Sequence, residues 1–166
     1  MATNKTNIRV GLLLEPGIGF FMKPLMQTLM LALVFSMPAS AQEDPAGLKY
    51  WHGIDKEVIT TSSGLQYKIL VAGKGRKPGA KDRVDVHYRG LLLDGTQFDS
   101  SYSEDEPVTL RLSRVIKGWT EGIQLMPVGS VFVFLIPPEL AYGEKGGGPI
   151  PPNATLIFEV ELFKIK

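Results

Sequence analysis

The polar side chains of this sequence offer few combinations that could do covalent, metal or phosphate chemistry. Asp85 and His87 lie two residues apart and would share one face of a strand, where they could touch one metal ion. An isolated pair of this kind is more often solvated. With two histidines and no cysteine in the chain, nucleophilic catalysis is not indicated. The glycine-rich segment 143–148 lacks the Lys-Ser/Thr pair that ends a phosphate-binding loop.

The composition is that of an ordinary folded domain without a basic excess. The 166 residues carry a formal net charge of +1, and residues 42–166 alone carry 15 Lys and Arg against 16 Asp and Glu. A nucleic-acid-binding chain would show a basic stripe or a strongly basic composition, so we expect no nucleic-acid partner. The lack of cysteine excludes disulfides and cysteine-based metal sites. We expect no metal and no cofactor.

The first 41 residues predict an N-terminal extension and a cleaved export signal. Residues 22–24 (Met-Lys-Pro) precede an apolar stretch at 25–37, and Ala-Ser-Ala at 39–41 has the small-x-small pattern of a signal-peptidase site. The apolar stretch is shorter than the ~20 residues that a membrane-spanning helix needs. The chain becomes polar at Gln42, where we expect the mature protein to begin.

Two alternatives remain open for this N-terminal region. A second apolar patch at residues 8–21 favours an uncleaved membrane anchor, although charged residues and prolines interrupt it. Met22 makes a more typical start than Met1, so we hypothesise that residues 1–21 extend the reading frame upstream. We expect an exported protein that is periplasmic, with secretion or membrane anchoring as alternatives.

Hydrophobic periodicity predicts several strands after Gly64. Strands are expected where apolar residues alternate or run continuously, near residues 65–71, 84–88, 109–112, 131–136 and 156–162. Asp94-Gly95 follows three leucines and predicts a hairpin turn.

One stretch has a helical period. Its apolar positions are Ile116, Trp119, Ile123 and Met126. Pro127 ends the pattern. We therefore expect an α+β fold, a twisted antiparallel sheet of about five strands wrapped on one short helix, over residues 64–166. Residues 42–63 are predicted to be a linker and lead-in.

Several motifs resemble the FKBP-type peptidyl-prolyl cis/trans isomerases. They are VHYRG at 86–90, DGTQFDSS at 94–101, VIKGWTEG at 115–122, AYG at 141–143 and PIPPNATLIF at 149–158. They stand in family order across residues 64–166. SSGLQY at 62–67 and QLMPVG at 124–129 are similar to the bacterial exported branch that includes the macrophage infectivity potentiators. Many of those carry a helical dimerisation domain; about twenty residues between Gln42 and Gly64 are too few for one, so we expect a monomer.

The resemblance implies an FKBP-like fold with a shallow apolar pocket for a proline ring. The implied catalytic residues are Tyr88, Phe98, Asp99, Trp119, Tyr142 and Phe158, and the implied substrate-binding residues are Val115, Ile116 and Ile150. Trp119 would form the floor and the Ile116 backbone N–H would bind a substrate carbonyl. Without the resemblance, most of these aromatics would be predicted as core residues, and Asp99 as a turn cap.

The resemblance implies a peptidyl-prolyl isomerase that speeds proline-limited folding of exported proteins without covalent chemistry. The alternatives are a binding module or holdase chaperone without useful turnover, and a receptor for a macrolide inhibitor in the same pocket. Two departures from the family bear on ligand preference. Residues 102–108 are acidic and then aliphatic, where many members have a basic residue and an aromatic. Arg114 stands where some members have an acid.

Overall fold

The computed structural model describes residues 46–103 and 106–166. The predicted N-terminal extension and export signal, residues 1–41, lie outside the described residues. Within the described part of the chain, no helix is long and apolar enough to cross a membrane.

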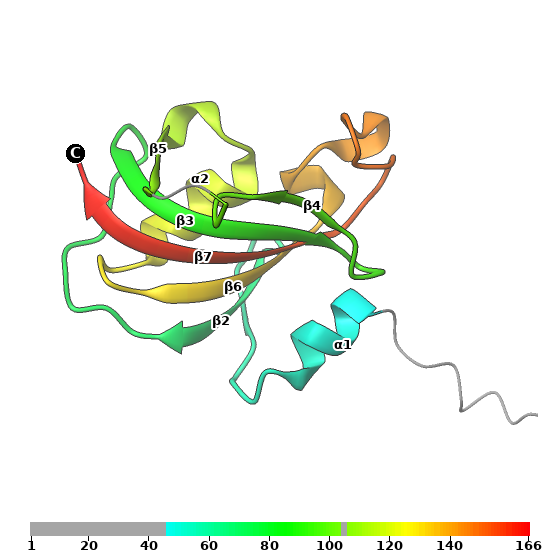
Figure 1. The fold of residues 1–166 in the computed structure, drawn as a ribbon, viewed down its shortest axis with the longest axis horizontal. Helices are drawn as coiled ribbons and strands as arrows, with labels where there is room; N and C mark the ends of the chain where they lie inside the picture. The colour runs from blue at the N-terminus through cyan, green and yellow to red at the C-terminus, as the bar shows by residue number, and fades with distance from the viewer. Residues whose placement is uncertain (1–45, 104–105) are drawn as a thin grey trace, which may run out of the picture. The chain divides into compact units, whose positions relative to one another are not determined.

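The strands form one antiparallel sheet (Figure 1). Along the sheet the strands follow the order β1 (Ile59–Thr60), β2 (Gln66–Val71), β6 (Val131–Ile136), β7 (Leu156–Ile165), β3 (Arg83–Leu92) and β4 (Gln97–Ser100), and β5 (Val108–Arg111) pairs with the first half of β3. The long strands β3 and β7 pair over most of their length and form the centre of the sheet. The predicted antiparallel α+β architecture is confirmed.

The structure adds short elements that the periodicity did not predict. β1 and β4 bring the sheet to seven strands, where about five were expected. They have two and four residues, too few for an alternating pattern to stand out. The predicted helix is α2 (Lys117–Leu125). The 3-10 turns are η1 (Leu112–Arg114), η2 (Pro138–Leu140) and η3 (Gly143–Lys145).

Helix α2 packs closely on one face of the sheet, where the main core lies. Trp119 and Ile123 are buried against the inward side chains of β6 and β7. Two glycines on the same side of the helix allow this approach. A Cβ at Gly118 would lie 2.5 Å from Ile136 Cγ2, and one at Gly122 would lie 2.6 Å from Phe134 Cε1. Any larger residue at either position would push the helix away from the sheet.

The opposite face of the sheet is covered in part by helix α1 (Ala46–Gly53), which lies in the segment predicted as a linker and lead-in. Trp51 is only 3% exposed because it packs on Leu91, Val133 and Ile157, whose side chains point away from α2. The spacing of apolar residues in so short a helix is weak, so the pattern alone did not predict it.

Polar contacts hold α1 in place beside Trp51. The buried Lys68 of β2 donates from Nζ to the carbonyl of Trp51 at 2.8 Å and to that of Ile54 at 3.0 Å, which satisfies carbonyls at the C-terminal end of the helix. The same ammonium lies 4.7 Å from the centre of the Trp51 ring. On the other side, the Tyr50 hydroxyl donates to Glu159, which also pairs with Arg89 at 3.3 Å.

We predict that Trp51→Ala lowers the free energy of unfolding by about 3 kcal/mol, because it removes a buried indole and leaves a cavity between α1 and the sheet. Urea unfolding followed by circular dichroism measures the change. Lys49→Ala in the same helix is the control: Lys49 is exposed, so its removal should change the value by less than about 0.5 kcal/mol. Equal midpoints for the wild type and Trp51→Ala would show that α1 does not contribute to stability.

Candidate functional site

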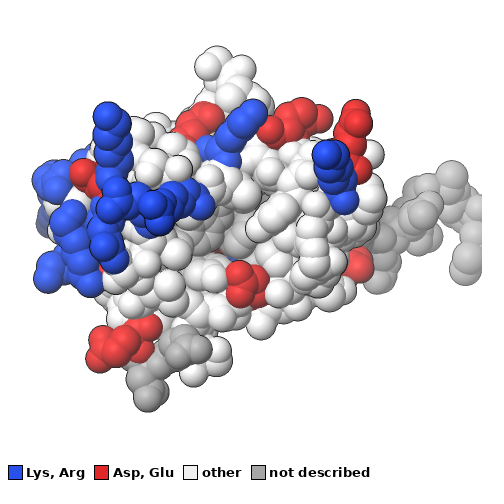
Figure 2. All heavy atoms as spheres, turned by 90° about the horizontal axis from the view of Figure 1, so that it is seen from above, with Lys and Arg blue, Asp and Glu red and all other residues white. Residues whose placement is uncertain are grey.

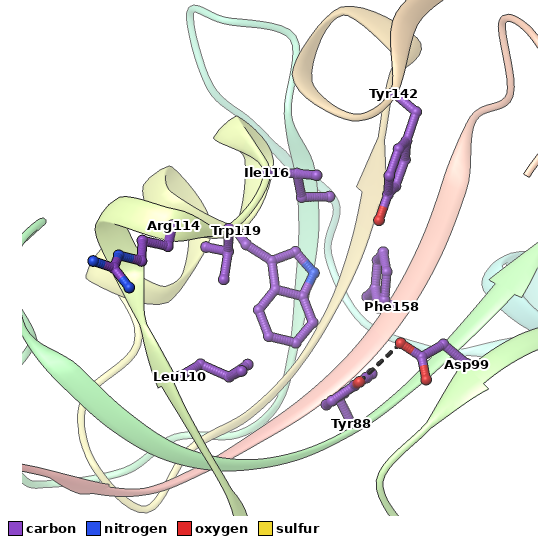
Figure 3. Close-up of a pocket in the computed structure, with 9 residues that line it drawn as sticks. Tyr88, Asp99, Leu110, Arg114, Ile116, Trp119, Tyr142 and Phe158 are labelled. Atoms are coloured by element: carbon purple, nitrogen blue, oxygen red, sulfur yellow. Dashed lines mark hydrogen bonds between the residues drawn. The ribbon is translucent and has the colours of Figure 1, made fainter. Parts of the chain in front are cut away.

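A pocket of about 490 Å³ opens on the α2 side of the sheet (Figure 3). It is lined by Tyr88, Asp99, Leu110, Arg114, Val115, Ile116, Trp119, Tyr142 and Phe158. The lining residues come from β3, β4, β5, η1, α2, the loop after η2, and β7, so the pocket exists only when the whole sheet and its helix are assembled. Its volume lies in the range of small-molecule and peptide side-chain sites.

Three aromatic rings form the floor and one wall of the pocket. Trp119, at the start of α2, is 5% exposed. Tyr88 and Phe158 meet it edge to face, with ring centres at 5.0 Å and 5.2 Å and interplanar angles of 88° and 85°. Within the described residues, the Trp119 indole N–H is buried without a hydrogen-bond partner. The arrangement holds each ring in one orientation and leaves an apolar surface open to the pocket.

Phe98 lies behind this wall and does not line the pocket. Its ring meets Phe158 at 5.4 Å and 89°. The two rings meet over Gly90 of β3, where a Cβ would be 2.7 Å from Phe98 Cζ and 2.8 Å from Phe158 Cε1. The glycine therefore makes room for both rings, and Phe98 supports Phe158 from outside the pocket.

A hydrogen bond between Tyr88 and Asp99 closes the edge of the pocket (Figure 3). The Tyr88 hydroxyl donates to Asp99 Oδ2 at 2.8 Å, and the Ser100 N–H donates to Asp99 Oδ1 at 2.9 Å. Burial, and then the Asp99 carboxylate, raise the pKa of Tyr88 from 10.0 to about 12. The phenol thus stays a neutral donor throughout the physiological pH range.

The turn before α2 presents backbone groups at the pocket. Ile116 is the N-cap of the helix, with φ −60° and ψ 154°, and its carbonyl accepts from the N–H groups of Trp119 and Thr120, both at 3.0 Å. In the part of the chain that the structure describes, no backbone carbonyl accepts from the Ile116 N–H. Since this residue lines the pocket, the N–H is a donor that a ligand carbonyl could use.

Tyr142 and Ile150 lie on the segment between β6 and β7 but in different surroundings. Tyr142 lines the pocket and is 43% exposed, with its hydroxyl directed into the pocket (Figure 3). Ile150 is 6% exposed and packs in the main core. Gly147 and Ile150 exchange two backbone hydrogen bonds of 2.9 Å. Ile150 therefore fixes the segment that carries Tyr142 and does not itself line the pocket.

The structure brings seven of the nine predicted site residues to one pocket, with Phe98 and Ile150 behind it. It adds Leu110 and Arg114, which the sequence analysis did not assign to the site. Leu110 was predicted only as part of a strand. Arg114 had been noted only as a departure from the family pattern. A comparison of motif positions could have suggested Arg114, since it directly precedes Val115.

The pair considered as a metal site makes separate contacts. Asp85 accepts from the Thr109 hydroxyl at 2.6 Å and pairs with Lys166 at 3.0 Å. His87 Nδ1 lies 3.1 Å from the Ser101 hydroxyl. In residues 46–103 and 106–166, no group of three or more His, Asp or Glu side chains could hold a metal ion.

Comparisons with known proteins agree on one family. The sequence profile of the FKBP-type peptidyl-prolyl cis-trans isomerases matches residues 74–163. The chain is 59% identical over 109 residues to an FKBP-type peptidyl-prolyl cis-trans isomerase FkpA of Aeromonas hydrophila, covering 66% of this chain and 41% of the relative. It is 52% identical over 110 residues to the outer membrane protein MIP of Legionella longbeachae, covering 66% and 47%. The chain thus spans less than half the length of these curated relatives.

Solved structures give the same result. The crystal structure of FkpA from Escherichia coli superposes with a TM-score of 0.65 at 48% identity, covering 73% of this chain and 58% of that one. A peptidyl-prolyl cis-trans isomerase from Pseudomonas syringae superposes with a TM-score of 0.62 at 38% identity, covering 73% and 91%.

The raised pKa of Tyr88 predicts a pH-dependent loss of stability at alkaline pH. Folding raises this pKa above the value in the unfolded chain, so the stabilisation is complete below about pH 10 and is lost as the pH rises toward 12. The pKa of Tyr50 is also raised to about 12, by burial and then by Glu159. Urea unfolding from pH 8 to 11.5 should therefore show a steeper loss for the wild type than for Tyr50→Phe/Tyr88→Phe. Equal slopes would contradict the prediction.

Proposed function

Because the chain belongs to the FKBP-type peptidyl-prolyl cis-trans isomerase family, we propose that it accelerates rotation about Xaa-Pro bonds in exported polypeptides, and that the aromatic pocket binds the proline. The observation that carries the proposal is the indole of Trp119, which lies at the bottom of an open pocket and is held there by edge-to-face contacts with Tyr88 and Phe158. A flat, apolar floor of this kind suits a proline ring, which is compact and has no N–H to satisfy.

The physics of the bond explains why such a pocket would be a catalyst. Rotation about a peptide bond has a barrier of ~18–20 kcal/mol because resonance makes the bond planar. In the twisted transition state resonance is lost and the amide is less dipolar. An apolar, water-poor surface therefore binds the twisted form better than the planar one, and each ~1.4 kcal/mol of this preference is a factor of ten in rate.

The pocket residues would divide the work without proton transfer. The rings of Trp119, Tyr88 and Phe158 would fix the proline ring. The N–H of Ile116 would hold the substrate carbonyl on one side, while the neutral Tyr88 hydroxyl and Asp99 define the opposite edge. Val115 and Tyr142 would complete the walls, and Phe98 and Ile150 would position them from behind. A macrolide inhibitor would compete for the same surface.

We predict that the purified protein accelerates the cis-to-trans exchange of a short Xaa-Pro peptide, and that a macrolide ligand of this pocket abolishes the acceleration. In Trp119→Ala and Phe98→Ala, kcat/KM should fall tenfold or more, because each change disturbs the packing of the aromatic rings at the bottom of the pocket. Since Trp119→Ala also removes a buried side chain, Trp119→Leu and the exposed Tyr142→Ala are included as better-folded variants. NMR exchange spectroscopy measures the rates and circular dichroism verifies folding.

Phe163→Ala is the control for Tyr142→Ala. Phe163 is an aromatic residue whose exposed fraction, 41%, is close to the 43% of Tyr142, and it does not line the pocket. It should retain wild-type kcat/KM. Full activity in both Phe98→Ala and Trp119→Leu would contradict the pocket assignment. A folded wild type that does not accelerate exchange but suppresses aggregation would contradict the isomerase function and favour a holdase chaperone.

We further propose that the protein is exported, acts in the periplasm on folding clients and is a monomer. Support for export comes from the signal-peptide pattern at residues 22–41 and from a relative named as an outer membrane protein. The prediction is that protein isolated from cells begins at or near Gln42 and has a monomeric mass. Intact mass spectrometry and light scattering measure both properties. Protein that retains residues 22–41 would indicate an uncleaved anchor.

A further inference from the structure

Three arginines meet in a second surface hollow that borders the pocket. Arg83 on β3, Arg111 on β5 and Arg114 in η1 line a depression of about 270 Å³. Leu110, Arg114 and Val115 line both this depression and the aromatic pocket, so the two adjoin. Figure 2 shows Lys and Arg side chains gathered at this end of the molecular face. We call the depression the arginine hollow.

The positive charge of the arginine hollow is not neutralised within the described residues. Arg83 and Arg111 are direct partners across the β3–β5 ladder, an arrangement in which like charges destabilise the sheet. No described carboxylate forms an ion pair with either arginine or with Arg114. No acidic side chain is among the residues that line the hollow.

The two carboxylates that flank Arg83 in the sequence are already engaged elsewhere. Asp82 pairs with Arg76 at 3.2 Å and accepts the N–H of Gly79 at 3.0 Å. Asp85 pairs with Lys166 at 3.0 Å. The three guanidinium groups therefore face solvent as a local positive site, although the chain as a whole has a net charge of only +1.

We propose that the arginine hollow binds Asp or Glu side chains of a client polypeptide whose prolyl bond lies in the aromatic pocket, so that the protein prefers clients with acidic residues near the proline. This inference rests on the proposed isomerase function. An extended chain advances ~3.3–3.6 Å per residue, so a side chain two to four residues from the proline reaches a surface that adjoins the pocket. Arginine is suited to this role because its planar fork binds a carboxylate through two parallel hydrogen bonds.

The shape of the surface favours a peptide over a nucleic acid or a membrane as the occupant. The arginines line a hollow that adjoins a pocket for one side chain, where an extended polypeptide would pass. A lipid surface or a nucleic-acid backbone would use charge spread over an exposed face, and residues 42–166 carry slightly more acidic than basic residues.

The test compares peptides that differ only in charge near one Xaa-Pro bond. Three residues on one side of the bond, starting two positions away, are Glu, Gln or Lys, and a second series places them on the other side. We expect kcat/KM for the Glu peptide of one series to exceed that of the Lys peptide by about three- to tenfold at 20 mM salt. At 0.5 M salt the ratio should fall below about two, because exposed charges are screened.

The variant Arg83→Gln/Arg111→Gln should abolish the preference for Glu and leave the Gln peptide unchanged, since neither residue lines the aromatic pocket. Lys49→Gln/Lys56→Gln removes the same charge from exposed positions in and just after α1 that do not line the hollow, and should keep the preference. Arg114→Gln, which borders the pocket, should reduce the preference too.

The outcomes separate this inference from the proposed function. Acceleration of all three peptides at equal rates in both series would overturn the inference and leave the isomerase function standing. Acceleration of none would overturn both. A preference for Glu that survives in Arg83→Gln/Arg111→Gln would place acidic recognition elsewhere. Equal peptide rates combined with arginine-dependent binding to phosphatidylglycerol vesicles would identify a membrane as the occupant and overturn the peptide assignment.

Discussion

The edge-to-face packing of Trp119 with Tyr88 and Phe158 is the interaction on which the rest of this structure depends. It belongs to the hydrophobic core, because Trp119 and Phe158 are 5% and 4% exposed, and it is also the floor of the pocket. The three rings come from α2, β3 and β7, so the floor forms only when the helix lies on the centre of the sheet. The pocket floor and the core therefore share the same side chains, so the floor is held in place by the stability of the fold itself.

That packing depends on glycines, which leave space beside them, as much as on the aromatic rings themselves. Gly90 leaves space for Phe98 and Phe158 above β3, and Gly118 with Gly122 let α2 approach Phe134 and Ile136. These approaches fix the helix within contact distance of the sheet, and the turn that precedes the helix is thereby held at the pocket. The backbone N–H of Ile116 is positioned by this packing and not by any side-chain cap.

The sequence predicted the parts of this arrangement that depend on local pattern. The alternation of apolar and polar residues predicted β2, β3 and β7, and the helical period predicted α2. The family motifs predicted the aromatic rings at the pocket. Helix α1 was not predicted because its burial depends on Leu91, Val133 and Ile157 and on a lysine cap from β2, all distant in sequence. Leu110 and Arg114 were missed because their place at the pocket is set by the pairing of β5 with β3. The separation of Phe98 and Ile150 from the pocket surface also depends on tertiary packing, since both have the apolar side chains expected of lining residues.

The polar groups beside α1 and those around the pocket differ in their partners. Beside α1, Lys68 caps the helix, and Tyr50 and Arg89 both bind Glu159, while the Arg89 Nε is buried without a partner among the described residues. At the pocket, the indole N–H of Trp119 has no partner among the described residues, and in the adjoining arginine hollow Arg83 and Arg111 oppose each other without an ion pair. Like charges that face each other across a ladder reduce stability, so the Arg83–Arg111 pair does not favour folding. A bound polypeptide with a carboxylate beside the arginines would offset this repulsion in the complex, and one of its carbonyls would accept from the free Ile116 N–H at the pocket.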